Sequence, residues 1–129
     1  MGIVVTKFGG SSLADAGQFR KVRDILLADE NRKYVVPSAP GRRDADDAKV
    51  TDLLYACHTS AAEGRAHEFE ETFSAIRERY LGIVEELGLS PECIATQLEQ
   101  ARFAILSGMG PDYAASRGEF LNGLLLSAY

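Results

Sequence analysis

The chain has 129 residues, of which 46% are hydrophobic and 26% are charged, and its formal net charge at pH 7 is -5. This length and composition are those of one ordinary globular domain that is large enough to bury a core. An acidic chain without a basic stripe is not expected to bind nucleic acid or an anionic membrane surface, because it could not neutralise their phosphates. A small anionic substrate is compatible, since it needs only a local cluster of positive charge.

Cysteine content and hydropathy indicate the cellular compartment of the protein. Cys57 and Cys93 are far apart and match no metal-binding spacing, so we expect two free thiols in a reducing environment. No apolar run reaches the length of a membrane span, and no charged segment precedes a hydrophobic leader. The sequence therefore predicts a cytoplasmic protein without a metal site of its own.

The first predicted element is a strand from Gly2 to Lys7, a β-branched run that we expect to be buried. Residues 8–12, with two glycines and two serines, follow it at once. Glycines allow backbone N–H groups to approach an anion, and a helix expected from about Ser12 would point its amino end at the same anion. The ammonium group of Lys7 could follow a transferring phosphoryl group. The pattern indicates a phosphate site; a plain glycine turn beside a solvated lysine is the alternative.

A second strand is predicted at residues 34–36, and it leads into Pro37 and Ser38. The segment between the strands is predicted to be helical, because apolar residues recur there at helical spacing: Phe19, Val22, Ile25 and Leu26. A connection of this length requires a parallel pair of strands. Ser38 would then lie at the same edge of the sheet as the glycines, where parallel sheets bind ligands, unless it is an ordinary turn serine. Residues 40–47 are expected to form a polar loop.

From about Lys49 the chain is predicted to be almost entirely helical, with a first helix that ends near Gly64. In the second helix, apolar residues step by four and three residues in alternation, which is typical of a seam for one partner helix: Phe69, Phe73, Ile76, Tyr80, Ile83 and Leu87. We expect this helix to stop at Gly88 and to form an antiparallel hairpin with the next helix, which Ser90 would cap. Pairing of the seam with a second copy of the chain is the alternative. A last helix is expected to begin at Pro111.

Polar residues in two of these helices are candidates for binding. Thr51 lies near a helix start, where its hydroxyl is expected to cap the helix, to donate to a substrate carboxylate, or to do both. Glu119 lies on the polar stripe of the apolar last helix. A buried carboxylate there needs a cation, which is either an arginine such as Arg117 or the ammonium group of a substrate.

Two features predict that the sequence is the front piece of a longer protein. The chain stops at Tyr129 on an apolar helix without a cap or a polar tail. Two parallel strands also make a poor sheet, because parallel sheets normally have more strands and are covered on both faces.

Together these motifs resemble the aspartokinase (aspartate kinase) family. The matching stretches are VVTKFGGSS, VVPSAPG followed by KVTDLL, and GPDYAASRGEFLNGLLL, in the order that the family uses. The resemblance implies an α/β domain with the amino-acid-kinase (carbamate-kinase-like) fold, of which residues 1–129 are the N-terminal portion. In that portion, short parallel strands precede a helix-rich segment with a long helical hairpin.

The resemblance also implies the reaction, which is the ATP-dependent phosphorylation of the β-carboxylate of L-aspartate to 4-phospho-L-aspartate. This is the first step towards lysine, threonine and methionine. The implied nucleotide-binding residues are Lys7, which is also the catalytic residue, Phe8, Gly9, Gly10 and Ser11. The implied substrate-binding residues are Ser38, Thr51 and Glu119, with Glu119 at the amino group. Mg²⁺ would be bound through the nucleotide phosphates, and the full-length enzyme would be a homo-oligomer.

The chain departs from the family's usual pattern at Pro37, Pro40 and the charged stretch 42–49. The second half of the family's kinase domain and its regulatory domains lie beyond residue 129, so we expect the chain alone to be inactive. One alternative is another enzyme of the same fold, acting on glutamate, acetylglutamate, carbamate or a nucleoside monophosphate. A second alternative is a non-catalytic module that binds phosphate or takes part in assembly.

Overall fold

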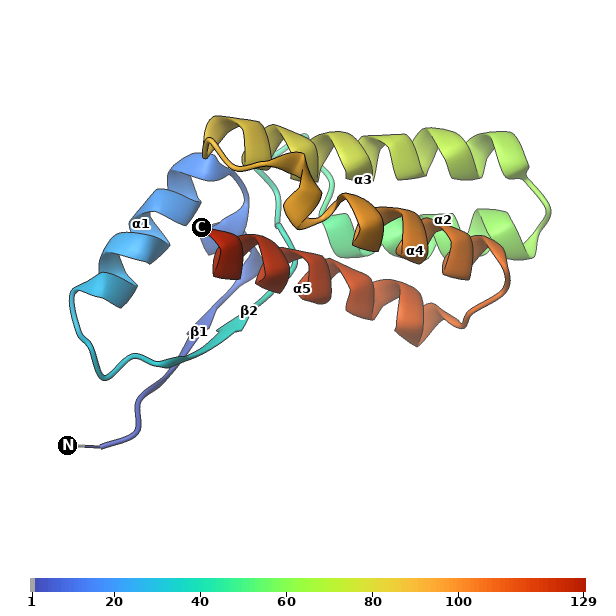
Figure 1. The fold of residues 1–129 in the computed structure, drawn as a ribbon. Coiled ribbons are helices and arrows are strands. Elements are labelled where there is room, and N and C mark those ends of the chain that lie inside the picture. The colour runs from blue at the N-terminus through green and yellow to red at the C-terminus, as the bar shows by residue number, and fades with distance from the viewer. Residues whose placement is uncertain (1) are drawn as a thin grey trace.

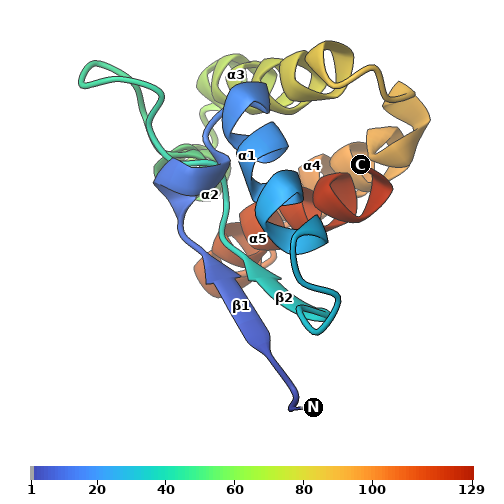
Figure 2. The same cartoon turned by 90° about the vertical axis from the view of Figure 1, so that its left-hand side faces the viewer.

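The computed structural model describes residues 2–129 and joins a two-stranded sheet to a helical bundle (Figure 1). Strand β1 (Val5–Phe8) pairs in parallel with strand β2 (Tyr34–Pro37), and helix α1 (Ala16–Leu27) lies between them in the sequence. The predicted β-α-β unit and its parallel pairing are therefore confirmed. Figure 2 shows the two strands at the edge of the molecule, with the helical bundle extending from their carboxyl ends.

The prediction that the first strand is buried holds for only one of its faces. Val5 pairs with Tyr34 and Lys7 pairs with Val36, and paired residues lie on the same face of a sheet. On this face Val5, Tyr34 and Val36 are 63%, 58% and 52% exposed. Phe8, on the other face, is buried. The difference arises because, within residues 2–129, helices cover one face of the strand pair and leave the other open to solvent.

The helix after β1 begins later than predicted. A short 3-10 helix, η1 (Gly10–Leu13), comes first, and α1 begins at Ala16. The side chain of Asp15 caps α1, with Oδ1 accepting a hydrogen bond from the Gln18 N–H at 2.9 Å. The Asp15 carboxylate therefore already occupies part of the amino end of α1, and the expected anion contact of this segment stays a prediction.

Four further helices form the bundle: α2 (Val50–Ala62), α3 (Ala66–Glu86), α4 (Ala95–Leu106) and α5 (Pro111–Ala128). Gly64 and Gly88 follow α2 and α3 with φ angles of 73° and 72°, a conformation that glycine adopts without strain and that ends helices. Ser90 caps the 3-10 helix η2 (Pro91–Cys93), through the Glu92 N–H, and not α4 as predicted. Within residues 2–129, none of the helices combines the length and the apolar character that a membrane span requires.

The seam on α3 is buried inside the chain, so the alternative of pairing with a second copy is not needed to cover it. Phe69, Phe73, Ile76 and Tyr80 are fully buried. The main partner of α3 is α2, which runs antiparallel to it across the Gly64 turn (Figure 1).

The long helical hairpin is therefore confirmed, but the prediction that α4 is its second helix is wrong. Helix α4 packs on α2 and α5 and reaches α3 through ion pairs, among them Arg77 with Glu99 at 2.7 Å and Arg102 with Glu70. A seam specifies one face of a helix, not its partner, and the short turn at Gly64 returns α2 and α3 onto each other directly.

Candidate functional site

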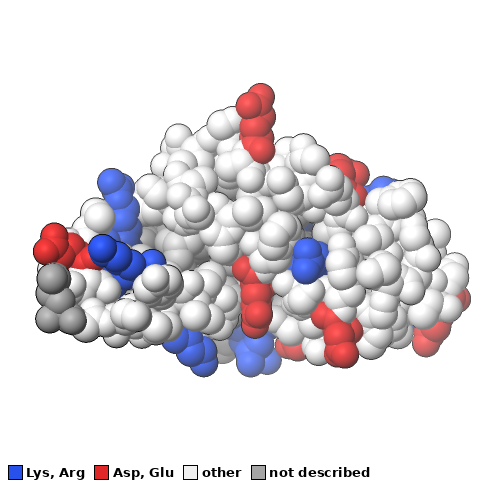
Figure 3. All heavy atoms as spheres, turned by 60° about the horizontal axis from the view of Figure 1, so that its bottom comes forward, with Lys and Arg blue, Asp and Glu red and all other residues white. Residues whose placement is uncertain are grey.

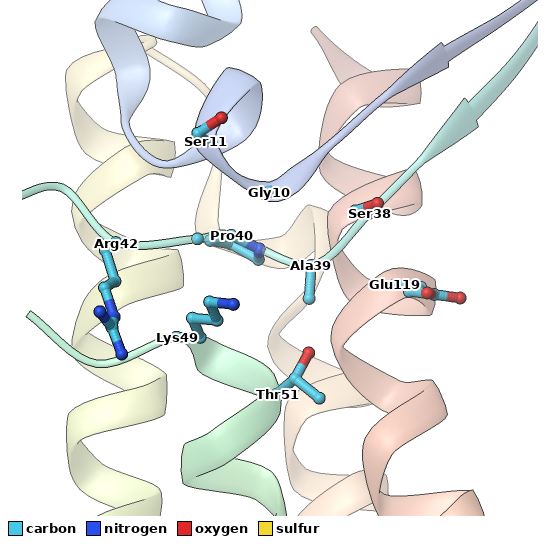
Figure 4. Close-up of a pocket in the computed structure, with 10 residues that line it drawn as sticks. Gly10, Ser11, Ser38, Ala39, Pro40, Arg42, Lys49, Thr51 and Glu119 are labelled. Carbon is cyan, nitrogen blue, oxygen red and sulfur yellow. The ribbon is translucent and has the colours of Figure 1, made fainter.

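A cavity of about 490 Å³ lies where the carboxyl ends of both strands meet the start of α2 and the middle of α5 (Figure 4). The residues that line it are Gly10, Ser11, Ser38, Ala39, Pro40, Gly41, Arg42, Lys49, Thr51 and Glu119. Parallel α/β sheets bind their ligands at this edge. The position of the cavity agrees with the edge that the sequence predicted.

Backbone contacts hold the two strand-end loops together. The Ser38 N–H donates to the Phe8 carbonyl at 3.0 Å, and the Gly41 N–H donates to the Gly10 carbonyl at 2.8 Å. A Cβ atom on Gly41 would lie 2.6 Å from the Gly10 carbonyl carbon. Glycine is therefore required at position 41 for the loops to touch backbone to backbone.

The start of α2 forms a second wall of the cavity. Lys49 is the N-cap residue and makes no side-chain cap, and the Val50 N–H donates to the Pro40 carbonyl at 3.1 Å. Thr51 lies inside the helix, so it does not cap the helix. In Figure 4 the Lys49 ammonium and the Thr51 hydroxyl point from α2 towards the loop that contains Pro40 and Ala39. An uncapped helix amino end beside a lysine favours a negatively charged ligand.

Glu119 reaches the cavity from α5, which packs closely on the strand-end loop. A Cβ atom on Gly118 would lie 2.7 Å from the Ala39 Cβ, so the absence of a side chain at this position lets the helix approach. The buried Tyr80 hydroxyl donates to the Gly118 carbonyl at 2.8 Å. Burial raises the pKa of the Tyr80 phenol far above its ordinary value, so it remains a donor. These contacts set the distance of α5 from the loop.

A buried amide connects the two substrate-binding residues that we predicted on the strand-end loop and on α5. Asn122 is fully buried one helical turn after Glu119, and its Nδ2 donates to the Ser38 carbonyl at 2.7 Å. The position of Ser38 is therefore fixed relative to that of Glu119.

Glu119 itself differs in two ways from the sequence-based interpretation. It is exposed at the cavity and not buried. Arg117, its expected internal partner, lies instead 4.6 Å from the ring centres of both Tyr113 and Phe120 and donates to the Ser116 hydroxyl. Among residues 2–129 no cation forms an ion pair with Glu119. Its carboxylate is available to a ligand.

The cavity brings together five of the predicted site residues: Gly10, Ser11, Ser38, Thr51 and Glu119. Lys7, Phe8 and Gly9 are not among the residues that line it. Lys7 lies on the open face of β1, and the Phe8 side chain belongs to the core. The role of Lys7 stays a prediction.

Sequence reasoning missed two cations that do line the cavity, Arg42 and Lys49. A signal for both was present, because Arg42 directly follows the loop glycine Gly41 and Lys49 opens the KVTDLL stretch. The cavity thus holds two positive groups and one negative group. On the face drawn in Figure 3, basic and acidic side chains are interspersed and form no large patch of one sign.

Comparison with known proteins decides the family. The chain matches the amino acid kinase family over residues 2–129. The chain belongs to the amino acid kinase family. Its amino-acid-kinase fold agrees with the architecture described above.

Individual members of this family are similar to the chain over almost its whole length. Aspartokinase 3 of Bacillus subtilis is 43% identical over 132 residues, which cover 97% of this chain and 28% of that relative. The crystal structure of Clostridium acetobutylicum aspartate kinase superimposes with a TM-score of 0.93 at 50% identity and covers 100% of this chain and 29% of that chain. Escherichia coli aspartokinase III, solved in complex with aspartate and ADP, gives a TM-score of 0.75 at 32% identity over 98% of this chain and 28% of that chain. The chain therefore spans between a quarter and a third of the length of these relatives.

Proposed function

We propose that this amino acid kinase chain is part of an aspartate kinase, and that the cavity binds L-aspartate while ATP phosphorylates the β-carboxylate. One observation carries the proposal: Glu119, without an ion-pair partner, shares a cavity with Arg42, Lys49 and the hydroxyl groups of Ser38 and Thr51. This arrangement complements a small molecule with one ammonium and two carboxylate groups. The E. coli relative solved with aspartate and ADP supports the same assignment.

In this proposal each wall of the cavity has its own task. Glu119 pairs with the α-ammonium group of L-aspartate, and this charge-assisted contact favours acceptors that carry an ammonium group over acceptors that lack one. Thr51 and the amino end of α2 bind a carboxylate of the substrate. Asn122 holds Ser38 in place by donating to the Ser38 carbonyl. The Ser38 hydroxyl then contributes a further hydrogen bond to the substrate.

The reaction needs little covalent chemistry from the protein. A β-carboxylate oxygen forms a bond to the γ-phosphorus of ATP, the bond from that phosphorus to the β,γ-bridging oxygen breaks, and ADP leaves. An aspartate carboxylate is already ionised at neutral pH, so no general base is required. The chain contributes positioning and positive charge. We propose that Lys7 and the start of η1, which has no side-chain cap, contact the nucleotide phosphates.

Mg²⁺ enters this proposal with the nucleotide. Within residues 2–129 no group of three or more His, Cys, Asp or Glu side chains is arranged to hold a metal ion. When bound to the phosphates, Mg²⁺ would neutralise part of their charge. We likewise propose that the chain acts as a portion of a larger catalytic domain. A cytoplasmic location stays a prediction from cysteine content and hydropathy, and homo-oligomerisation stays a prediction from the resemblance.

The test compares L-aspartate with succinate, which has the same two carboxylates but no ammonium group, by calorimetric titration in the presence of ADP and Mg²⁺. We expect the chain to bind L-aspartate more tightly than succinate. Glu119→Gln should lower this ratio of affinities by roughly tenfold or more. Asp112→Asn, on the same helix but outside the cavity, is the matched control and should keep the preference. Lys7→Ala should weaken the binding of ADP with Mg²⁺.

Other results would redirect the proposal. Stronger binding of glutamate, acetylglutamate or carbamate than of L-aspartate would favour another enzyme of the same fold. Nucleotide binding without any acceptor binding would favour a phosphate-binding module. Equal affinities for L-aspartate and succinate in the unmodified chain would refute the role of Glu119.

A further inference from the structure

The guanidinium group of Arg79 joins three loops that are far apart in the sequence. Arg79 lies on α3, and its side chain is only 5% exposed. Its Nη2 donates to the Gly41 carbonyl at 2.8 Å and to the Ala14 carbonyl at 3.2 Å, and its Nη1 donates to the Ala48 carbonyl at 3.0 Å. One acceptor follows η1, one follows β2 and one precedes α2. A single side chain therefore holds the segments that lead into three parts of the cavity wall.

A charged pair fastens the loop between Gly41 and Lys49 to the same guanidinium. Asp47 Oδ2 lies 3.3 Å from Arg79 Nη1. Asp47 also accepts hydrogen bonds from Arg43, at 2.7 Å from Nε, 2.9 Å from Nη2 and 3.0 Å from the backbone N–H. These bonds hold the pKa of the Asp47 carboxyl well below its ordinary range, so it is ionised at neutral pH. The bonds between Arg43 and Asp47 close the loop on itself, and the contact of Asp47 with Arg79 attaches it to α3.

Each carbonyl that Arg79 holds is close in sequence to a residue of the cavity. Gly41 is itself in the wall, Ala48 immediately precedes Lys49, and Ala14 follows Ser11 by three residues. Burial lowers the pKa of the Arg79 guanidinium, but an arginine stays charged at neutral pH. A buried charge is tolerated only while its partners are in place. The charge on Arg79 therefore favours the one arrangement in which all three loops are present.

We propose that Arg79 is a positioning residue of the site, which sets the shape of the cavity without lining it. For the identity of the ligand this inference rests on the proposed function. Lysine cannot replace it, because an ammonium group lacks the planar fork that reaches several carbonyls at once. Arg79 acts through the Gly41, Ala14 and Ala48 carbonyls on the groups that touch substrate.

The experiment measures amide hydrogen exchange of the 129-residue chain, and then L-aspartate affinity by titration. The variants are Arg79→Lys, Arg79→Met and, as matched control on the same helix, Arg77→Gln. Arg77 pairs with Glu99 at 2.7 Å and is not bonded to the loops. We expect the Arg79 variants to exchange faster at the Gly41 and Val50 amides, which donate across the loops. Their affinity for L-aspartate should fall on the order of tenfold.

The control variant Arg77→Gln should lower the free energy of unfolding without changing the affinity for L-aspartate or the amide exchange of the loops. If the Arg79 variants exchange faster uniformly and bind L-aspartate as tightly as the unmodified chain, Arg79 is only a stabilising residue and the inference is wrong. If the unmodified chain does not bind L-aspartate, the proposed function fails. Exchange at the two loop amides still decides the role of Arg79 in that case.

A milder variant covers the outcome in which the Arg79 variants do not fold. Asp47→Asn leaves the three carbonyl contacts and removes only the charge that fastens loop 42–48. It should accelerate exchange within that loop and weaken L-aspartate binding in the same direction by a smaller factor. Unchanged exchange and affinity in this variant would overturn the part of the inference that assigns the Asp47 charge a role in holding the loop.

Discussion

At the scale of single residues, the site depends on positions where a side chain is missing. Gly118 is a helix residue, and glycine is normally unfavourable in a helix. Its lack of a Cβ atom lets α5 approach the loop that carries Ser38, since an added Cβ would lie 2.7 Å from the Ala39 Cβ and 3.2 Å from Leu54 Cδ1. The neighbouring Glu119 reaches the cavity because of this close approach.

This contact predicts opposite effects for two glycine substitutions. Gly82→Ala on α3, where nothing lies within 4 Å of the added Cβ, should raise the free energy of unfolding by up to about 1 kcal/mol, because alanine favours the helix. Gly118→Ala should lower it by about 1–3 kcal/mol despite the same gain, because Ala39 is part of a packed backbone contact. Urea unfolding measures both. Equal effects of the two substitutions would show that α5 does not need this approach.

At the scale of elements, the amino ends of α1 and α2 differ in side-chain capping. Asp15 caps α1, whereas α2 begins at the cavity without a side-chain cap. The amino end of α2 lies at the candidate site, and its first N–H, that of Val50, donates to the Pro40 carbonyl. Helices α3, α4 and α5 also begin without a side-chain cap. The capped amino end of α1 contributes to the stability of the fold.

The difference can be tested at Asp15. Asp15→Ala should lower the free energy of unfolding by about 1 kcal/mol, because the Gln18 N–H loses its acceptor. Asp15→Asn should keep most of that stability, since asparagine is an equally good cap. Thermal and urea unfolding measure both variants. A loss of nucleotide or L-aspartate binding in Asp15→Asn, with stability intact, would show that this helix end belongs to the site after all.

At the scale of the whole molecule, one core extends from α1 through the helical bundle. The largest buried side chains come from η1, α1, all four bundle helices and Ile94, which lies between η2 and α4. Cys57 of α2 is fully buried within this core. Burial raises the pKa of its thiol from an ordinary value of 9.0 to about 12. Ionisation of the Cys57 thiol is therefore coupled to the unfolding of the core.

This pKa predicts that stability falls at alkaline pH. Above pH 9 the unfolded chain releases the Cys57 proton while the folded chain retains it, so the stability present below that pH is lost progressively as pH rises towards about 12. Cys57→Ala should reduce the slope of unfolding free energy against pH in this range, as measured by urea unfolding. Cys93→Ala, at a half-buried position, is the control and should change the slope less. Parallel curves for Cys57→Ala and the unmodified chain would contradict the prediction.

The sequence by itself determined the local structure and much of the site. Helical periodicity located α2 to α4, Pro111 marked the start of α5, and the glycines at 64 and 88 marked two helix ends, because these signals depend on neighbours within one or two turns. Ser38, Thr51 and Glu119 were identified from motifs, and the structure places them at one cavity.

Only the tertiary structure decided how these elements meet. It showed that α3 pairs with α2, that Arg42 and Lys49 line the cavity, and that Arg79 reaches the Ala14 carbonyl 65 residues away. Local patterns specify which face of a helix is apolar, but not which distant backbone that face or a buried side chain will contact. Such contacts depend on the packing of the whole chain, because a buried guanidinium finds its acceptors only after the loops have assembled around it.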